Sequence, residues 1–195
     1  MTVVDASEHL AERRDDPRYE RLMEATRAAA LDGYDAVSMR ELAETCRMSM
    51  TTIYQFCRSK DQLIAEAHLG AMEGWRERLL ARPPRGATAE ERLLSVVRSY
   101  VKALVEDERR TRTLMRAMYS LDPAVVPTRM GVTEAANTIL DAAIGDEAIA
   151  HPAEVVQTLG HVIDSVIFSW VARRHEADWA QAELEAAVRA LVGGR

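Results

Sequence analysis

Residues 38–60 read SMRELAETCRMSMTTIYQFCRSK, and this stretch predicts two short helices joined by a tight turn. Ser38 can cap the first helix, and Glu41, three residues later, completes a capping box with it. Ser49 stands in the equivalent place before the second helix. Apolar residues recur at helical spacing, and Ala43 offers a small side chain where the two helices would cross. The stretch therefore predicts a helix-turn-helix.

The outer face of the second helix differs from an ordinary solvated helix surface. Its side chains are Met50, Thr51, Thr52, Tyr54 and Gln55, which offer hydrogen bonds and flat apolar surface instead of a mixture of Glu and Lys. A glutamine can form two hydrogen bonds with adenine, and methyl groups can contact the methyl of thymine. The face therefore predicts binding to a double-stranded DNA operator, with Met50, Thr51 and Gln55 as base readers.

The same stretch resembles the N-terminal DNA-binding domain of the TetR family of bacterial one-component repressors. The family pattern is approximately Ser-x-x-Thr-Leu/Ile-Tyr-x-His/Tyr-Phe-x-Ser/Asn-Lys-Glu/Asp, and the residues in register with it are Ser49, Thr52, Ile53, Tyr54, Ser59, Lys60 and Asp61. The sequence departs from the pattern at Arg47, which replaces the turn glycine, at Phe56 in the His/Tyr position, and at Cys57 in place of Phe. A left-handed Arg47 would cost about 1 kcal/mol relative to glycine, which a fold can tolerate.

The resemblance also implies which residues contact the DNA backbone. Thr52, Tyr54 and Lys60 match the family's phosphate contacts and should set register and affinity. Ser38 and Arg40, at the start of the preceding helix, should reach the flanking phosphates. For each of these residues the alternative is an exposed polar side chain with no partner.

Length and composition predict an all-α protein with two domains. The 195 residues are 48% hydrophobic, which allows a substantial core, and no run alternates β-branched and polar residues as a strand would. The formal charge is -6, yet basic side chains outnumber acidic ones in residues 38–60, where phosphates would bind. We expect a flexible N-terminal arm over residues 1–16, a three-helix helix-turn-helix domain over 17–64, and a helical ligand-binding and dimerisation domain over 65–195, with about nine helices altogether.

Other classes of site leave little trace in the sequence. The five histidines are scattered, so neither a metal site nor a cofactor is expected, and Cys46 and Cys57 lie where a packing role is favoured over a redox switch. The longest apolar run, residues 162–172, is too short to cross a bilayer and contains Asp164, so we expect a cytoplasmic protein without membrane contact. No catalytic signature is present. A helical enzyme or a protein-binding adaptor that retains a helix-turn-helix stays the alternative.

The region after residue 151 predicts self-association. Apolar residues cover more than half the circumference of the helix expected to begin at His151 and Pro152. A body of about five helices has too few neighbours to cover such a helix, so its spare surface should meet a second subunit. DNA reading also favours a homodimer, because one short helix contacts only a few base pairs. The expected interface comprises Val155, Leu159, Val162, Val166, Trp170, Leu184, Val188 and Leu191. The alternative is a central core helix in a monomer.

Aromatic, methionine and aliphatic side chains of the body predict a cavity for a small hydrophobic effector, although such residues are often plain core. The expected lining is Trp75, Leu79, Tyr100, Leu104, Met115, Met118, Tyr119, Ile163 and Phe168. His161 and Asp164 join this set, because polar groups on an apolar helix need partners from an effector, a second subunit or each other. The segments YDAVSMRELAE, LMRAMYSLD and SWVARR resemble repressors of sterol and cholesterol catabolism, which implies a steroid, a fatty acyl derivative or an acyl-CoA as effector.

Overall fold

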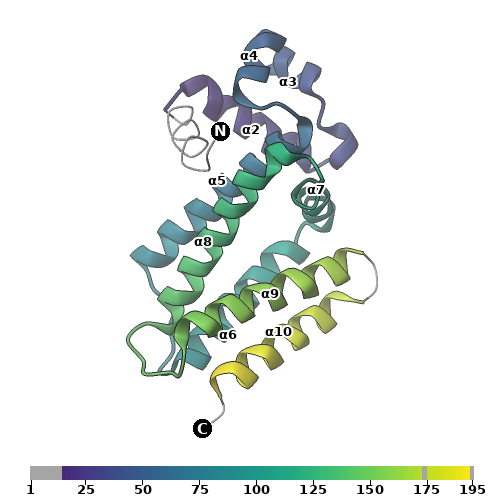
Figure 1. Ribbon diagram of the computed structural model, residues 1–195. Coiled ribbons are helices and arrows are strands. Elements are labelled where there is room, and N and C mark those ends of the chain that lie inside the picture. The colour runs from purple at the N-terminus through teal and green to yellow at the C-terminus, as the bar shows by residue number, and fades with distance from the viewer. Residues whose placement is uncertain (1–14, 173–174, 194–195) are drawn as a thin grey trace. The chain divides into compact units, whose positions relative to one another are not determined.

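The computed structural model describes residues 15–172 and 175–193, and every regular element within those ranges is a helix (Figure 1). The all-α prediction is therefore confirmed. The elements are α2 (Pro17–Ala30), the 3-10 turn η1 (Tyr34–Ala36), α3 (Met39–Cys46), α4 (Met50–Phe56), α5 (Lys60–Ala81), α6 (Ala89–Val105), α7 (Glu108–Met118), the 3-10 turn η2 (Pro123–Val125), α8 (Val126–Ile144), α9 (Pro152–Val171) and α10 (Ala177–Val192). Residues 1–14 of the expected arm lie outside the described residues.

Polar side chains fix where several helices begin. Asp16 accepts a hydrogen bond from the α2 backbone at 2.8 Å, and Thr88 accepts one from the α6 backbone at 3.2 Å. Ser59 accepts a hydrogen bond from the Gln62 amide at 3.1 Å and so caps α5. The Gln62 side chain accepts in return from the Arg58 amide at 2.8 Å, one residue before the position that a capping box would use.

The chain forms two compact units. Of the described residues, those up to Ala71 and Arg109–Val132 form the first unit, whereas Met72–Glu108 and those from Thr133 onward form the second. In the first unit a buried cluster of Ala65, Met118 and Val125 joins α5, α7 and η2. Compact packing therefore groups α7 with the helix-turn-helix, although the sequence boundary after residue 64 had assigned it to the ligand-binding domain.

The core of the first unit holds the helix-turn-helix against α2. α2 contacts α3, α3 contacts α4, and Leu22 and Ile53 are completely buried. The rings of Tyr19 and Phe56 pack edge to face, with 5.7 Å between their centroids. Tyr19 also donates a hydrogen bond to the buried carboxylate of Glu66 at 2.5 Å. One side chain of α2 therefore fixes both α4 and α5.

The second unit is built around α10, which packs against α6 and α9 (Figure 1). α9 buries one side only, and its buried residues are Val155, Val156, Leu159, Val166, Ile167 and Trp170. His161, Asp164 and Phe168 are exposed. Val162 and Ile163 are half-buried, so apolar surface remains on the outer side of α9 beside these polar residues, and the expectation that this side meets a second subunit stays a prediction.

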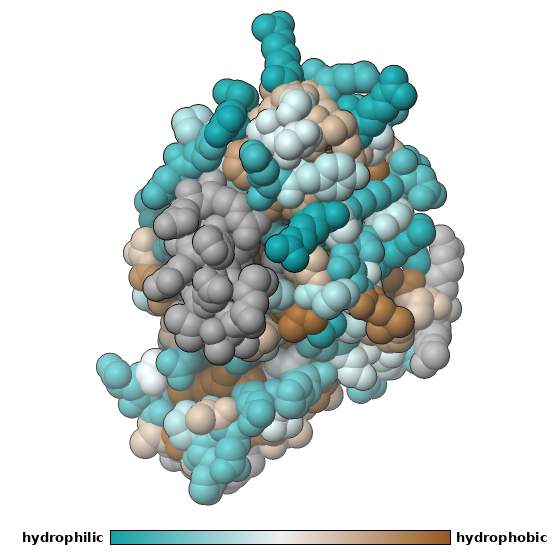
Figure 2. Space-filling model, turned by 45° about the horizontal axis from the view of Figure 1, so that its top comes forward, coloured by the Kyte–Doolittle hydropathy of each residue, from teal (hydrophilic) through white to brown (hydrophobic). Residues whose placement is uncertain are grey.

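Exposed apolar side chains are few in the part of the chain that the structure describes. Figure 2 shows a face on which hydrophilic side chains predominate and hydrophobic patches are separate from one another. The exposed large apolar residues are Leu31, Met50, Tyr54, Leu80, Val105, Tyr119, Leu121, Val126, Met130 and Phe168. Single exposed apolar residues are normal on protein surfaces, so a role for any of them needs further evidence.

Arg92 of α6 closes the C-terminal end of α8. Its guanidinium donates hydrogen bonds to the carbonyls of Ala143 at 2.7 Å and Ile144 at 2.6 Å, and it lies 3.4 Å from the Glu147 carboxylate. The last carbonyls of a helix have no partner within the helix. Arg92 therefore supplies hydrogen bonds that α8 cannot make by itself.

Replacing Arg92 with Ala should lower the free energy of unfolding by about 1.5–3 kcal/mol, because two carbonyls lose a charged donor. Arg85→Ala, at an exposed position in the preceding loop, is the matched control and should change it by less than about 0.5 kcal/mol. Chemical denaturation followed by circular dichroism measures both. Equal stability of the two variants would show that water replaces the guanidinium without loss.

Glu185 of α10 links that helix to α6 through a charged network. Arg98 donates hydrogen bonds to both of its carboxylate oxygens, at 2.8 and 3.1 Å. Arg189 donates a further bond at 2.7 Å and Gln181 one at 3.1 Å. The hydrogen bonds from Arg98 are the main reason that the pKa of Glu185 falls from 4.5 to about 2.

The Glu185 network should stabilise the fold above pH 4.5, and this contribution should decline as the pH falls towards about 2. The reason is that the unfolded chain binds the proton at a higher pH than the folded chain does. Glu185→Gln should therefore melt below the parent at neutral pH, and the two melting temperatures should converge under acid. Glu44→Gln removes an exposed partner of Arg40. Its melting temperature should stay close to that of the parent at every pH. A Glu185→Gln difference that stays constant with pH would contradict this account.

Candidate DNA-binding and effector sites

α4 presents the predicted base readers to solvent. Ile53 and Phe56 are buried, and Met50, Thr51 and Gln55 are exposed on the other side of the helix. A helix of seven residues makes only about two turns, so two inward side chains define which side faces outward. The structure therefore brings the three predicted base readers together on one accessible face.

Two of the predicted phosphate contacts on α4 differ in accessibility. Tyr54 is 52% exposed, whereas Thr52 is half-buried. The Ser49 hydroxyl oxygen accepts a hydrogen bond from the Thr52 amide at 3.0 Å and lies 2.9 Å from the Thr52 hydroxyl. Ser49 is thus the N-cap of α4. The roles of Tyr54 and Thr52 at phosphates stay predictions.

The N-terminal end of α3 carries the two side chains predicted to contact the flanking DNA phosphates. Ser38 caps the helix by accepting a hydrogen bond from the Glu41 amide at 3.4 Å. Arg40 is exposed and pairs with Glu44 at 3.2 Å. Exposed pairs of this kind contribute little to stability, so DNA can compete with Glu44 for the guanidinium.

The turn between α3 and α4 has the conformation that the family's glycine would adopt. Arg47 has φ 53° and ψ 47°, which is the left-handed region. The Met48 amide donates to the Ala43 carbonyl at 2.8 Å, so the turn closes the end of α3. The predicted left-handed turn at Arg47 is confirmed.

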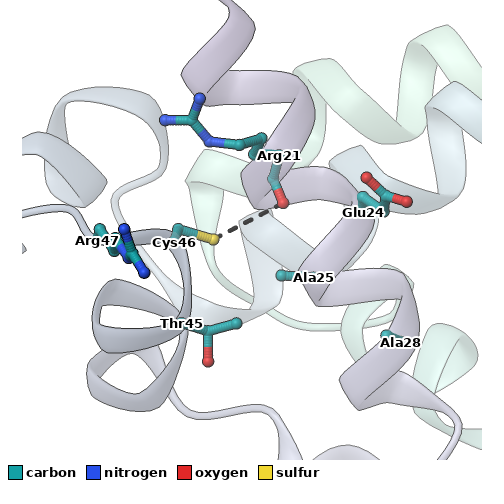
Figure 3. A pocket seen from close by; sticks show the side chains of 7 residues that line it. All are labelled: Arg21, Glu24, Ala25, Ala28, Thr45, Cys46 and Arg47. Carbon is teal, nitrogen blue, oxygen red and sulfur yellow. Dashed lines mark hydrogen bonds between the residues drawn. The ribbon is translucent and has the colours of Figure 1, made fainter.

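An open hollow of about 610 Å³ lies beside Cys46, a feature that the sequence did not indicate (Figure 3). Its lining residues are Arg21, Glu24, Ala25, Ala28, Thr45, Cys46 and Arg47. The Cys46 sulfur lies 3.7 Å from the Arg21 carbonyl, and burial raises the pKa of the Cys46 thiol. A protonated thiol reacts slowly, so this geometry supports the packing role expected for Cys46. Cys57 is completely buried.

Lys60, the third predicted phosphate contact, lies at the first position of α5 and is half-buried. Its ammonium lies 4.1 Å from the centroid of the Tyr34 ring, and burial lowers the pKa of Lys60. The guanidinium of Arg116 in α7 lies 3.7 Å from the same centroid. Sequence reasoning missed Tyr34, because a residue in a short turn after Gly33 belongs to no periodic pattern.

The eleven candidate effector-pocket residues are divided between the two units. In the second unit Trp75 and Tyr100 stack with 5.6 Å between centroids and an interplanar angle of 8°. Leu79 and Leu104 are buried, Ile163 is half-buried, and His161, Asp164 and Phe168 are exposed. In the first unit Met115 and Met118 are buried and Tyr119 is 40% exposed. A single effector pocket formed from these residues stays a prediction.

Most of the expected dimer contacts are unavailable to a partner. The buried residues are Val155, Leu159, Val166, Trp170, Leu184 and Val188, whereas Val162 and Leu191 are half-buried. The six buried residues lie on helices that pack within the chain, where α10 contacts α6 and α9, and their part in an interface stays a prediction. An interface on these helices would have to use the sides that the chain itself leaves open.

Two further features bear on the class of protein. No group of three His, Cys, Asp or Glu side chains within residues 15–172 and 175–193 is arranged to hold a metal ion. Across the same described residues, no helix combines the length and the apolar character needed to span a membrane.

Comparison with known families covers most of the chain. Residues 22–67 match the family described as "Bacterial regulatory proteins, tetR family", and residues 86–191 match "Tetracyclin repressor-like, C-terminal domain". The protein belongs to the TetR family. The resemblance found around Ser49 and Lys60 is thereby confirmed, and it extends over the body as well. TetR-family regulators bind DNA operators and small-molecule effectors and act as dimers.

Relatives of this TetR-family protein include named repressors. It is 29% identical over 185 residues to the HTH-type transcriptional repressor KstR of Mycolicibacterium smegmatis, covering 90% of this chain and 87% of that protein. Identity to KstR of Rhodococcus jostii is 27% over 178 residues, covering 90% and 83%. These similarities agree with the resemblance to sterol-catabolism repressors seen in short segments of the sequence.

Solved structures share the fold. A TetR transcriptional regulator from Rhodococcus sp. RHA1 has a TM-score of 0.78 at 19% identity, covering 89% of this chain and 94% of that one. The transcriptional regulator FadR from Bacillus subtilis, solved in complex with stearoyl-CoA, has a TM-score of 0.67 at 18% identity, covering 91% and 99%. At these identities the likeness concerns the fold alone.

Substitutions at Gln55 and Lys60 should have different effects on DNA binding. Gln55→Ala should relax preference at one base pair of each half-site, by about 1–3 kcal/mol, because a base contact is lost. Lys60→Ala should weaken binding to all sequences alike and reduce the slope of log affinity against log salt by about 0.9. Fluorescence anisotropy on a panel of operator variants separates the two effects. Uniform losses from both variants would contradict the division into base and phosphate contacts.

Proposed function

We propose that this TetR-family protein is a transcriptional repressor that binds a double-stranded DNA operator as a homodimer and leaves it when a small hydrophobic effector binds. The exposed outer face of α4 carries the proposal. Met50, Thr51 and Gln55 lie there together, on a helix whose other side is anchored in the core by Ile53 and Phe56. A rigid helix with accessible polar and methyl groups is suited to reading base edges in the major groove.

Cationic and polar side chains flank this face at the places where DNA phosphates would lie. Arg40 is on the helix that precedes the turn, and Lys60 begins the helix that follows α4. Ser38 and Ser49 cap the two helices of the motif, so the positive ends of both helix dipoles are close to these side chains. Phosphate contacts at these positions fix the register in which α4 enters the groove.

The homodimer uses the outer sides of α9 and α10. α10 exposes Ala182, Ala186 and Ala190 at four-residue spacing, and α9 exposes Ser165 and Phe168. Small side chains along one side of a helix let a second helix approach closely, and an exposed phenylalanine loses contact with water in such a contact. The dimer supplies two copies of α4, which one operator with two half-sites requires.

The effector is a steroid, a fatty acid or its CoA thioester. Support comes from the similarity to the KstR repressors and from the fold shared with FadR, which was solved with stearoyl-CoA. The stacked pair of Trp75 and Tyr100 and the buried leucines 79 and 104 offer apolar surface for a hydrophobic ligand. The protein acts in the cytoplasm, where its operator is found.

A gel-shift experiment with DNA from upstream of the protein's own gene tests the proposal. The protein should shift that fragment and leave a coding-sequence fragment of equal length unshifted. Stearoyl-CoA, stearic acid and cholesterol are then added separately, with CoA alone as the control for the nucleotide. At least one of the three hydrophobic compounds should release the DNA, whereas CoA should not. Failure to shift any upstream fragment at low salt would overturn the DNA-binding proposal, and release by none of the compounds would overturn the effector class.

A further inference from the structure

Two cations approach the ring of Tyr34, a residue that was not among the predicted site residues. The ammonium of Lys60 lies 4.1 Å from the ring centroid, and the guanidinium of Arg116 lies 3.7 Å from it. All three residues belong to the first compact unit. A cation within about 6 Å of an aromatic centroid is attracted by the negative face of the ring. Tyr34 therefore holds the candidate phosphate contact of the helix-turn-helix and a side chain of α7 at once.

The ring is itself fixed by hydrogen bonds. The Tyr34 hydroxyl donates to the carboxylate of Asp61, the neighbour of Lys60 in the chain. The other oxygen of that carboxylate accepts a hydrogen bond from the Ser120 hydroxyl at 2.6 Å. Burial, followed by the bond to Asp61, raises the pKa of Tyr34 to about 12, so the phenol keeps the proton that it donates. The ring, the first turn of α5 and the segment after α7 are thus bonded to one another.

Asp122, in the segment after α7, is influenced by the start of α5 as well. Hydrogen bonding with the Ser59 side chain is the main cause of the lowered pKa of Asp122. Asp122 in turn accepts a hydrogen bond from the Ala124 amide at 2.9 Å.

The position of Lys60 matters because a lysine side chain has many rotamers. A free lysine must give up this freedom when it binds a phosphate, whereas one already held against a ring gives up less. Arg116 lies beside the same ring and its positive charge acts against that of Lys60, whereas the carboxylates of Asp35 and Asp61 act in its favour. Asp35 also lies 3.7 Å from the Arg116 guanidinium.

We propose that Tyr34 is a positioning residue for DNA binding: its ring holds Lys60 for the phosphate contact, and α7 and the segment after it hold the ring through Arg116 and Ser120. The proposal rests on the proposed function, because the phosphate contact of Lys60 belongs to it. Met115 and Tyr119, two effector-pocket candidates, neighbour Arg116 and Ser120 in the chain. A shift of α7 on effector binding would therefore move the residues that hold Lys60 in place.

A double-mutant cycle between Tyr34 and Lys60 tests the proposal. Fluorescence anisotropy measures the affinity of the whole chain for an operator duplex over a range of salt concentrations. Tyr34→Leu, which removes the ring, should lower affinity about tenfold and reduce the salt slope by about 0.9, as Lys60→Ala does. The variant with both changes should bind no more weakly than Lys60→Ala alone. Tyr34→Phe keeps the ring and should keep the salt slope of the parent.

A second pair of changes leaves the ring in place, in case Tyr34→Leu fails to fold. Arg116→Gln combined with Ser120→Ala should weaken binding about threefold in the parent chain and have no further effect in the Lys60→Ala chain. Lys102→Gln removes an exposed cation of α6 and is the matched control, with no effect expected. Thermal unfolding of every variant confirms that the fold is kept.

The outcomes separate the two hypotheses. If the parent chain binds no DNA, or if Lys60→Ala leaves the salt slope unchanged, the proposed function or its phosphate contact fails. If Lys60→Ala lowers the slope while Tyr34→Leu keeps the slope of the parent, the positioning role of Tyr34 is overturned. Equal losses from the Arg116 and Ser120 changes in the parent and in the Lys60→Ala chain would overturn the role of α7.

Discussion

A helix of seven residues is unstable by itself in water, so the position of α4 depends on what its inner side contacts. Ile53 is completely buried, and the Phe56 ring packs edge to face on Tyr19 of α2. Tyr19 also bonds Glu66 of α5. These contacts orient α4 relative to the helices before and after it. The outer side of α4 can then carry residues chosen for a partner, because none of them is needed to hold the helix in place.

A buried carboxylate in the first unit has to be paired, and this requirement organises the polar part of the core. Glu66 accepts hydrogen bonds from Tyr19 at 2.5 Å and from Gln62 at 2.7 Å. Asp61, five residues earlier, accepts from Tyr34 and from Ser120. These two carboxylates of α5 thereby join segments that are distant in sequence. Lys60 is the first residue of the same helix. The bonds that stabilise the unit therefore also fix the position of Lys60.

The two halves of the sequence differ in how well they could be interpreted. For α3 and α4 the caps at Ser38 and Ser49 and the left-handed turn at Arg47 follow from local rules that act over three or four residues. For α9 the composition could not tell which apolar residues lie inside, since Leu159 is completely buried whereas Phe168 is exposed. Composition counts apolar residues, whereas burial depends on which of them point toward a neighbouring helix.

The sequence by itself determined the helices, their caps, the helix-turn-helix and the exposed face of α4, because each follows from spacing along a single helix. Only the tertiary structure showed that α7 packs in the same unit as the helix-turn-helix, and that Tyr34 contacts both Lys60 and Arg116. These contacts join residues that are 26 and 82 positions apart in the chain. No periodic pattern relates residues at such separations, since their proximity results from the way the helices pack around a shared core.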